Sequence, residues 1–303
     1  MLLVITGAQG NIGWKFLEHY CRRGQGFSRV VGIDRVPITE DRATQLAVWS
    51  AANPHGAPAT HMVVAELGDP LDARWTAVVA KADVLLHLAA VNPFPGATWT
   101  DATQSFDMAA SVFLVAARAT RVVYASTNHV MGAYLQDDLG PGLLTPALPP
   151  GPGTVWHTGQ TAMDSTIYAA GKWAGERLNH MLSVRSDGRR TAVSLRIGWV
   201  QPGDNVPATL SATGTPFETP DPARPPSARD ARWFRGLWLS NHDLVHVLDA
   251  ALRVDASGWP APHVLVHAVS QNADSPWSNT ECASLLGYAP VDSVDGAVRE
   301  HGF

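Results

Sequence analysis

The chain has 303 residues, of which 46% are hydrophobic and 16% charged; this composition predicts a large folded core and excludes intrinsic disorder. Its formal net charge of −5 argues against nucleic acid or an acidic membrane surface as a partner, and no apolar run is long enough to span a membrane. Two cysteines are too few for a disulfide framework, and the N-terminus MLLVITGAQG lacks the basic region of a signal peptide. We therefore expect a reduced, cytoplasmic setting.

Short apolar, β-branched runs alternate with helical stretches along the chain. Strands are predicted, in chain order, at Met1–Thr6, Val30–Ile33, Met62–Ala65, Val84–Leu88, Arg121–Ser126, Val193–Ile197 and Val264–Ala268. Helices are predicted at 11–23, 101–119 and 161–185. This alternation predicts an α/β fold built on a doubly wound parallel sheet with right-handed crossovers.

Two stretches rich in proline and glycine, 137–160 and 202–230, interrupt this alternation and are predicted to be loops. Loops of this length within a compact domain are either lids over a site or simple insertions, and the sequence leaves both readings open. We assign residues 1–200 to a nucleotide-binding domain that includes the catalytic helix. Residues 201–303 are mostly assigned to a small substrate-binding lobe, from which the strand near 264–268 can return to the sheet.

The segment VITGAQGNIG follows the first strand and opens the first helix. Gly7 permits a tight turn, Gly10 permits a pyrophosphate to approach the backbone, and Gly13 permits the helix to pack close to the sheet. Asp34 ends the second strand, where a carboxylate accepts hydrogen bonds from the adenosine ribose and repels a 2′-phosphate. This Rossmann-type pattern predicts NAD in preference to NADP, although the neighbouring Arg35 can soften that preference. The alternative is a strand-turn-helix unit without a cofactor.

Six short segments occur in an order that resembles the extended short-chain dehydrogenase/reductase family, of the NAD-dependent epimerase/dehydratase type. They are TGAQGNIG, GID, HLAA, YASTNHVMG, YAAGK and LRIG, and the resemblance that they mark covers most of the chain. Within that family, STNHVMG, WLSNHDLVHVL and SQNADSPWSNTECASLLGY resemble segments of the uronate dehydrogenases and their sugar-active relatives.

The resemblance implies a catalytic set of Thr127, Tyr168 and Lys172. Tyr168 and Lys172 are four residues apart on a predicted helix, so both point the same way. A tyrosine that acts as a base near pH 7 needs its pKa lowered by roughly three units, about 4 kcal/mol. The Lys172 ammonium and the nicotinamide cation are expected to provide this, and Lys172 also to hold the nicotinamide ribose. Thr127 is expected to orient the reacting oxygen.

The resemblance assigns cofactor contacts to the glycine turn, the strand ends and the catalytic helix. These contacts are Gly7, Gln9, Gly10, Asn11, Ile12, Gly13, Asp34, Arg35, Glu66, Leu67, Leu88, Ala89, Ala90, Ser126, Tyr168, Lys172 and Ile197. The substrate contacts it assigns are Asn92, Thr127, Asn128, His129, Trp199, Trp233 and Arg235. Asn128 and His129 would hold sugar hydroxyls or a carboxylate; the alternative for His129 is a structural histidine.

The substrate half departs from the uronate dehydrogenase pattern. Ser105 and Phe106 stand near the position of an asparagine that helps a proton relay, and Trp199 replaces a serine that holds the substrate carboxylate. The serine that follows HLAA in those enzymes is Val91 or Asn92 here. Their carboxylate-binding arginine aligns near Trp233, which Arg232 and Arg235 flank. This pattern favours a changed substrate, bulkier or less polar than a free uronate, over a lost activity.

Two histidine pairs have metal-like spacing: His242 with His246, and His263 with His267. No glutamate completes an HExxH motif, and the second pair lies on a predicted strand, so we expect no catalytic metal.

The leading hypothesis is an NAD-dependent oxidoreductase that acts on a hydroxyl or ketone of a sugar, sugar acid or glycosylated metabolite. An NAD-retaining sugar or nucleoside epimerase that works through a transient ketone is the first alternative. A non-catalytic nucleotide-sensing protein is the second, although such proteins generally lack the Tyr-Lys pair. The resemblance also implies a homodimer.

Overall fold

The computed structural model describes residues 1–91, 96–157, 162–210 and 227–296. Its centre is a seven-stranded sheet in the order β3-β2-β1-β4-β5-β8-β9, in which all neighbouring strands are parallel. The strands are β1 (Leu2–Thr6), β2 (Arg29–Asp34), β3 (Ala59–Val64), β4 (Val84–His87), β5 (Arg121–Thr127), β8 (Thr191–Ile197) and β9 (His263–Ala268). Because the strand order reverses between β1 and β4, ligands are expected at the carboxyl ends of these strands.

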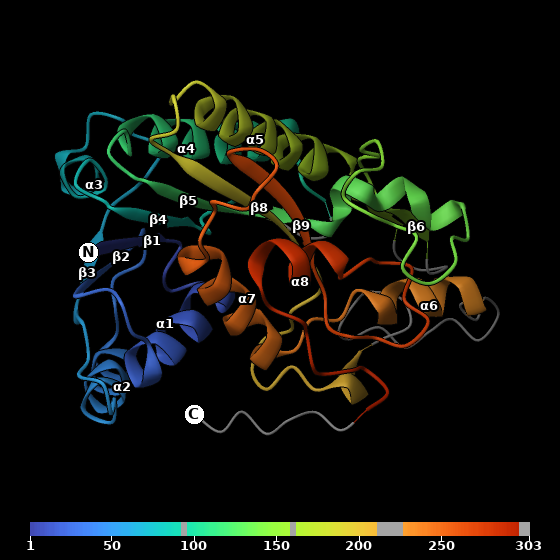
Figure 1. Ribbon diagram of the computed structural model, residues 1–303, viewed down its shortest axis with the longest axis horizontal. Helices are drawn as coiled ribbons and strands as arrows, with labels where there is room; N and C mark the ends of the chain where they lie inside the picture. Colours follow the sequence, from blue (N-terminus) through green and yellow to red (C-terminus); the bar gives the residue numbers. More distant parts are fainter. Residues whose placement is uncertain (92–95, 158–161, 211–226, 297–303) are drawn as a thin grey trace.

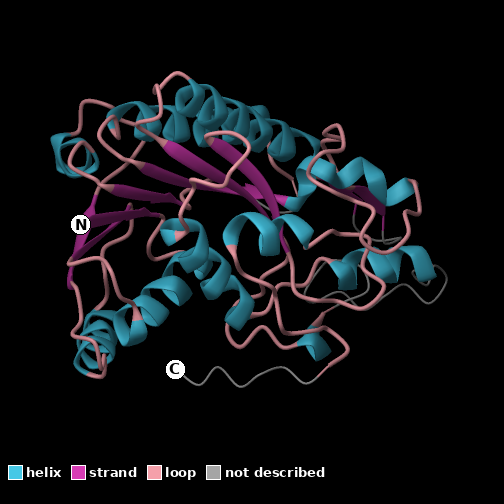
Figure 2. Cartoon of the chain, in the orientation of Figure 1, coloured by secondary structure: helices cyan, strands magenta, loops and turns pink. Residues whose placement is uncertain are grey.

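Helices cover both faces of the sheet (Figures 1 and 2). They are α1 (Asn11–Arg23), α2 (Glu40–Ala51), α3 (Ala73–Val79), α4 (Trp99–Val115), α5 (Thr166–Val184), α6 (Ala228–Gly236), α7 (Asn241–Arg253) and α8 (Thr280–Leu286). On one face, Phe16 of α1 and Leu248 of α7 share a buried cluster with Leu3 of β1. On the other, Trp75 of α3 and Val112 of α4 are buried with sheet side chains. Alternate residues of each strand thus feed two separate cores.

A third buried cluster lies around the 3-10 helix η1 (Asn128–Gln136) and α6. Its members are Met131, Leu135, Leu144, Trp233, Phe234, Leu237, Val269 and Trp277. Isolated bridges from Leu144 to Trp277 and from Trp199 to Trp238 connect its segments. The lobe at the edge of the sheet therefore combines residues from both sides of position 200.

The doubly wound parallel sheet that the sequence predicts is confirmed, and every predicted strand exists with small shifts at its ends. The predicted helix 101–119 is α4, which ends at Val115. The start predicted at 161 for the catalytic helix is wrong, because residues 162–164 form strand β7 (Ala162–Asp164), paired with β6 (Val155–His157). The predicted loop 137–160 therefore includes β6, and the predicted loop 202–230 includes the 3-10 turn η2 (Pro207–Thr209) and the start of α6.

Within the described ranges, no helix combines the length and hydropathy needed to cross a bilayer.

Candidate active site

Two cavities, of about 540 and 340 Å³, lie at the carboxyl ends of the central strands. Both are lined by Gly7, Gly10, Leu88 and Ala90, so they are the two halves of one groove across the switch in strand order. All the residues assigned above to the cofactor line one cavity or the other. An elongated dinucleotide is the ligand shape that such a groove fits.

The glycine turn shapes the middle of the groove. Gly7 has a φ of +68°, and a Cβ atom there would lie 2.7 Å from the Ala89 nitrogen. A Cβ atom on Gly13 would lie 2.3 Å from the Gly7 carbonyl oxygen. Gly10 is the N-cap of α1 and has no side chain that could accept hydrogen bonds from the first amides of this helix. The turn thus fits the pyrophosphate of NAD.

The smaller cavity carries the groups expected around an adenosine. The Asp34 carboxylate accepts hydrogen bonds from the backbone N–H groups of Gln9 and Val36, at 2.9 and 3.2 Å. Arg42, which the sequence analysis missed, donates to the Gln9 carbonyl at 2.8 Å and lies 4.4 Å from the centroid of the Trp14 ring. Arg42 also lines the cavity. Its side chain reaches the site from α2, a helix that the sequence analysis did not predict.

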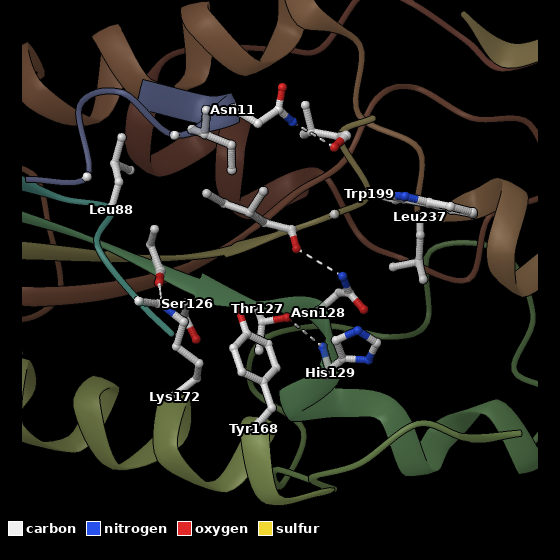
Figure 3. A pocket seen from close by; sticks show the side chains of 18 of the residues that line it. Asn11, Leu88, Ser126, Thr127, Asn128, His129, Tyr168, Lys172, Trp199 and Leu237 are labelled. Atoms are coloured by element: carbon white, nitrogen blue, oxygen red, sulfur yellow. Dashed lines mark hydrogen bonds between the residues drawn. The ribbon is translucent and has the colours of Figure 1, made fainter. Parts of the chain in front are cut away.

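Thr127, Tyr168 and Lys172 line the larger cavity (Figure 3). Thr127 ends β5, and the other two project from consecutive turns of α5. Lys172 is buried, and its Nζ donates to the Ala125 carbonyl at 2.5 Å and lies 4.8 Å from the centroid of the Tyr124 ring. The strand end and the helix thus bring the three side chains together at one end of the groove.

Burial controls the ionisation of Tyr168 and Lys172. It raises the pKa of Tyr168 to about 12, and a hydrogen bond with Thr127 acts in the opposite direction. Burial lowers the pKa of Lys172 to about 8, although the negative charge of Glu176 acts to raise it. With a pKa of about 12, Tyr168 needs positive charge beside it to act as a base near pH 7.

Glu176 lies one turn beyond Lys172, and the sequence analysis did not identify it. Its carboxylate accepts a hydrogen bond from Ser126 Oγ at 2.5 Å and two from Arg196, at 2.9 and 2.8 Å. The Glu176 and Arg196 side chains are only 2% and 1% exposed. This buried pair joins α5, β5 and β8 next to the turn of α5 that carries Lys172.

The other end of the larger cavity has polar and apolar walls (Figure 3). Asn128 donates from Nδ2 to the Ile197 carbonyl at 3.1 Å. His129 Nδ1 is 2.8 Å from Thr154 Oγ1, and burial lowers the pKa of this histidine to about 4. Trp199 lines the same cavity, as do Met163, Phe234 and Leu237, which the sequence analysis missed.

Two residues assigned to the substrate lie elsewhere. Trp233 packs against Trp277, with ring centroids 5.1 Å apart, and lines neither cavity. Arg235 forms an ion pair with Asp295. Their assignment to the substrate stays a prediction, and the groove is lined by Phe234 of α6 and by Leu237, which follows this helix. A loose alignment could not predict which face of α6 lies towards the groove. Asn92 lies outside the described residues.

Ser105 is one of the two residues, with Phe106, that the resemblance places near the relay position. Its hydroxyl donates to the Val91 carbonyl at 3.1 Å and accepts from the Val91 N–H at 2.9 Å. Ser105 therefore anchors the chain that follows β4, and it lines neither cavity.

Among the described residues, His242, Asp243 and Asp292 place potential metal ligands within 4.8 Å of one another. None of the three lines the groove. The Asp243 carboxylate already accepts hydrogen bonds from Ser270 and Tyr288, both at 2.6 Å.

Comparison with known proteins agrees with this geometry. Residues 3–199 match the NAD dependent epimerase/dehydratase family. The chain is 29% identical to an L-arabinose 1-dehydrogenase (NAD(P)(+)) of Haloferax volcanii over 216 residues, 70% of this chain and 75% of that one. It is 28% identical to a uronate dehydrogenase of Agrobacterium fabrum over 232 residues, 74% of this chain and 67% of that one.

A solved structure of UDP-glucuronic acid 4-epimerase from Bacillus cereus, in complex with UDP-glucuronic acid and NAD, has the same fold. Its TM-score is 0.62 at 16% identity, over 97% of this chain and 95% of that one. With a family match over residues 3–199, the resemblance drawn from the short motifs is confirmed. The chain belongs to the NAD-dependent epimerase/dehydratase family, the extended short-chain dehydrogenases/reductases.

Proposed function

We propose that this protein is an NAD-dependent oxidoreductase that acts on a hydroxyl or ketone of a sugar or sugar-derived metabolite. The observation that carries the proposal is the convergence of Thr127, Tyr168 and Lys172 at one end of a groove whose middle is a glycine turn. The sugar dehydrogenases among its relatives support the substrate class.

In the direction of oxidation, Thr127 hydrogen-bonds the reacting hydroxyl and Tyr168 accepts its proton. When bound, NAD supplies the hydride acceptor and a positive ring next to the tyrosine. That charge would lower the high pKa that burial imposes on Tyr168. Lys172 would hold the nicotinamide ribose, and Ser126 and Glu176 keep the end of β5 in register with α5.

We propose NAD as the preferred cofactor over NADP. Asp34 lines the smaller cavity and presents a negative charge where a 2′-phosphate would lie. Arg35 and Arg42 line the same cavity, and their positive charges reduce the preference for NAD over NADP without reversing it.

The test is NADH formation by wild-type and Tyr168→Phe proteins with a panel of aldoses and uronates, run with NAD and with NADP. We expect Tyr168→Phe to lower turnover at least about a hundredfold, because the variant lacks the hydroxyl that is proposed to accept the proton. Tyr134→Phe is the matched control, since the Tyr134 hydroxyl donates to the Pro149 carbonyl and does not line the groove. Full turnover by a folded Tyr168→Phe protein would refute the proposal.

A second candidate function is epimerisation through a transient ketone. The name of the family includes epimerases. An epimerase must retain its cofactor between turnovers. Purified protein that carries NAD and converts substrate without added cofactor would favour this candidate over net oxidation.

We also propose a homodimer in the cytoplasm, with a substrate-binding lobe drawn mostly from residues 201–303. Cys21 and Cys282 are free and buried, which suits a reducing compartment.

A further inference from the structure

We infer that the substrate end of the groove selects an uncharged ligand that donates a hydroxyl to Asn128 and lays an apolar surface against Trp199. The inference rests on the proposed function and narrows its substrate class: neutral sugars, above all those with a deoxy, alkyl or aryl portion, in place of uronates and sugar phosphates.

The orientation of the Asn128 amide is fixed by its neighbour. Nδ2 faces the carbonyl of Ile197, which can only accept a hydrogen bond. The opposite atom, Oδ1, is buried and has no partner among the described residues. A buried acceptor without a partner is costly, so it favours a ligand that donates a hydrogen bond. A carboxylate or phosphate oxygen would instead be repelled.

His129 adds no positive charge. Its Nδ1 bonds to Thr154, and a pKa of about 4 keeps the ring neutral near pH 7. A neutral imidazole can exchange a hydrogen bond with a hydroxyl, but it cannot neutralise an anion.

The arginines nearest in sequence to the expected anion site are paired with carboxylates elsewhere. Arg229 pairs with Asp230, Arg232 with Asp138 and Arg235 with Asp295. In the described part of the chain, the cationic side chain that lines the larger cavity is Lys172, which donates to Ala125 at the catalytic end. An anionic substituent at the substrate end would lose its hydration without gaining a counter-charge from the described residues.

Apolar side chains form another wall of the cavity that Asn128 and His129 line. Trp199 is fixed through its backbone, which donates to the Leu237 carbonyl at 2.7 Å and accepts from the Leu239 N–H at 3.0 Å. Leu237, Phe234 and Met163 extend the wall, and Figure 3 shows Trp199 and Leu237 together at the end away from Leu88. An indole beside aliphatic side chains suits a sugar face, a methyl group or an aromatic ring.

Calorimetric titration of the NADH-loaded protein with phenyl β-D-glucoside and phenyl β-D-glucuronide tests the inference. The two probes differ only at C6, which is a hydroxymethyl group in one and a carboxylate in the other. We expect the glucoside to bind at least about tenfold more tightly, because only the glucuronide must bury an unpaired charge. Equal or tighter binding of the glucuronide would overturn the inference, and so would a failure of both probes to bind.

Variants of Trp199 test whether its ring is the apolar surface that contacts the ligand. Trp199→Ser should weaken glucoside binding about tenfold, and Trp199→Phe, which keeps an apolar ring, should stay within about threefold of wild type. Unchanged NADH affinity shows that each variant is folded. Equal effects of both variants, or none, would contradict the assignment of the wall.

This binding measurement is independent of hydride transfer. If Tyr168→Phe keeps full turnover while the glucoside preference holds, the proposed function fails and the binding inference stands. If NADH forms most rapidly from uronates and the glucuronide binds best, the inference fails and the proposed function stands.

Discussion

Glu176 connects three structural elements behind the catalytic residues. It faces Arg196 of β8 and Ser126 of β5 from the same helix that carries Tyr168 and Lys172. Arg196 is almost fully buried, so its charge depends on this one carboxylate. Removing one partner of such a pair leaves a buried charge without compensation.

We therefore predict that Glu176→Gln lowers the free energy of unfolding by about 3 kcal/mol. Equilibrium unfolding in urea measures this. The matched control is Glu18→Gln, which removes a half-exposed i,i+4 pair with Arg22 and should cost less than about 0.5 kcal/mol. A cost for Glu176→Gln no larger than that of the control would show that the buried pair does not stabilise the fold.

The sequence alone predicted which residues local spacing brings together. The three glycines act within one turn, and Tyr168 and Lys172 face one way because they are four apart on a helix. Arg42 and Glu176 escaped prediction because their roles depend on partners distant in sequence: Gln9 for one, Ser126 and Arg196 for the other. Such contacts follow from packing, which periodicity does not specify.

Helices and strands, too, were predicted where local sequence determines them and missed where packing does. The buried strands were predicted because continuous β-branched runs such as RVVGID and RVVYAST are typical of parallel sheets covered on both faces. The short helix α3 and the helices α6, α7 and α8 were not predicted. α6 follows directly on a long segment rich in proline and glycine. Which of its residues lie towards the cavity depends on the packing of the third buried cluster.

The junction of β1 and α1 depends on the missing side chain of Gly13. An alanine Cβ there would lie 2.3 Å from the Gly7 carbonyl oxygen and 2.8 Å from the Ala8 Cα, both backbone atoms that cannot move aside alone. We predict that Gly13→Ala opens the turn, lowers the free energy of unfolding by about 2 kcal/mol and weakens NAD binding at least about tenfold.

Urea unfolding with and without NAD measures both effects, since a bound ligand stabilises the native state in proportion to its affinity. Gly258→Ala is the control, because a Cβ atom there meets nothing within 4 Å. Wild-type stabilisation of Gly13→Ala by NAD would show that the turn tolerates the methyl group.

Among the described residues, burial keeps five histidines neutral. It lowers the pKa to about 4 for His19 and His129, and to about 3 for His87, His263 and His267. An exposed histidine in the unfolded chain has a pKa of about 6.5. Between these values the unfolded chain binds more protons, so stability rises with pH up to about 6.5 and falls as the pH drops towards 3.

We predict a loss of about 1 kcal/mol for each of these histidines when the pH falls from about 6.5 to 5.5. Urea unfolding at several pH values measures it. His263→Gln can keep the hydrogen bond to Ser194 and should reduce the total loss in the free energy of unfolding by about 1 kcal/mol. The control is His61→Gln, at an exposed position, which should leave the total loss unchanged. A stability that does not vary over this range would contradict the prediction.

The outer face of α5 is the surface that best fits the proposed homodimer. Its exposed positions are 173, 177, 181 and 184, a spacing that forms one stripe along the helix, and three of them are Trp173, Met181 and Val184. α4 lies beside α5 (Figure 1) and adds Leu114, which is 61% exposed. Four large apolar side chains on two adjacent helices form a surface that a second copy would cover.

We predict that the protein elutes from gel filtration at twice its mass of 32.4 kDa, and that the double variant Trp173→Asp, Met181→Asp elutes as a monomer. Charges on both sides of a two-fold interface would lie close together and lose their hydration. Leu71→Asp is the control, since Leu71 is 89% exposed and lies outside both helices; it should remain dimeric. Elution of the wild type at the monomer mass would refute the dimer, and a dimeric double variant would place its interface on another face.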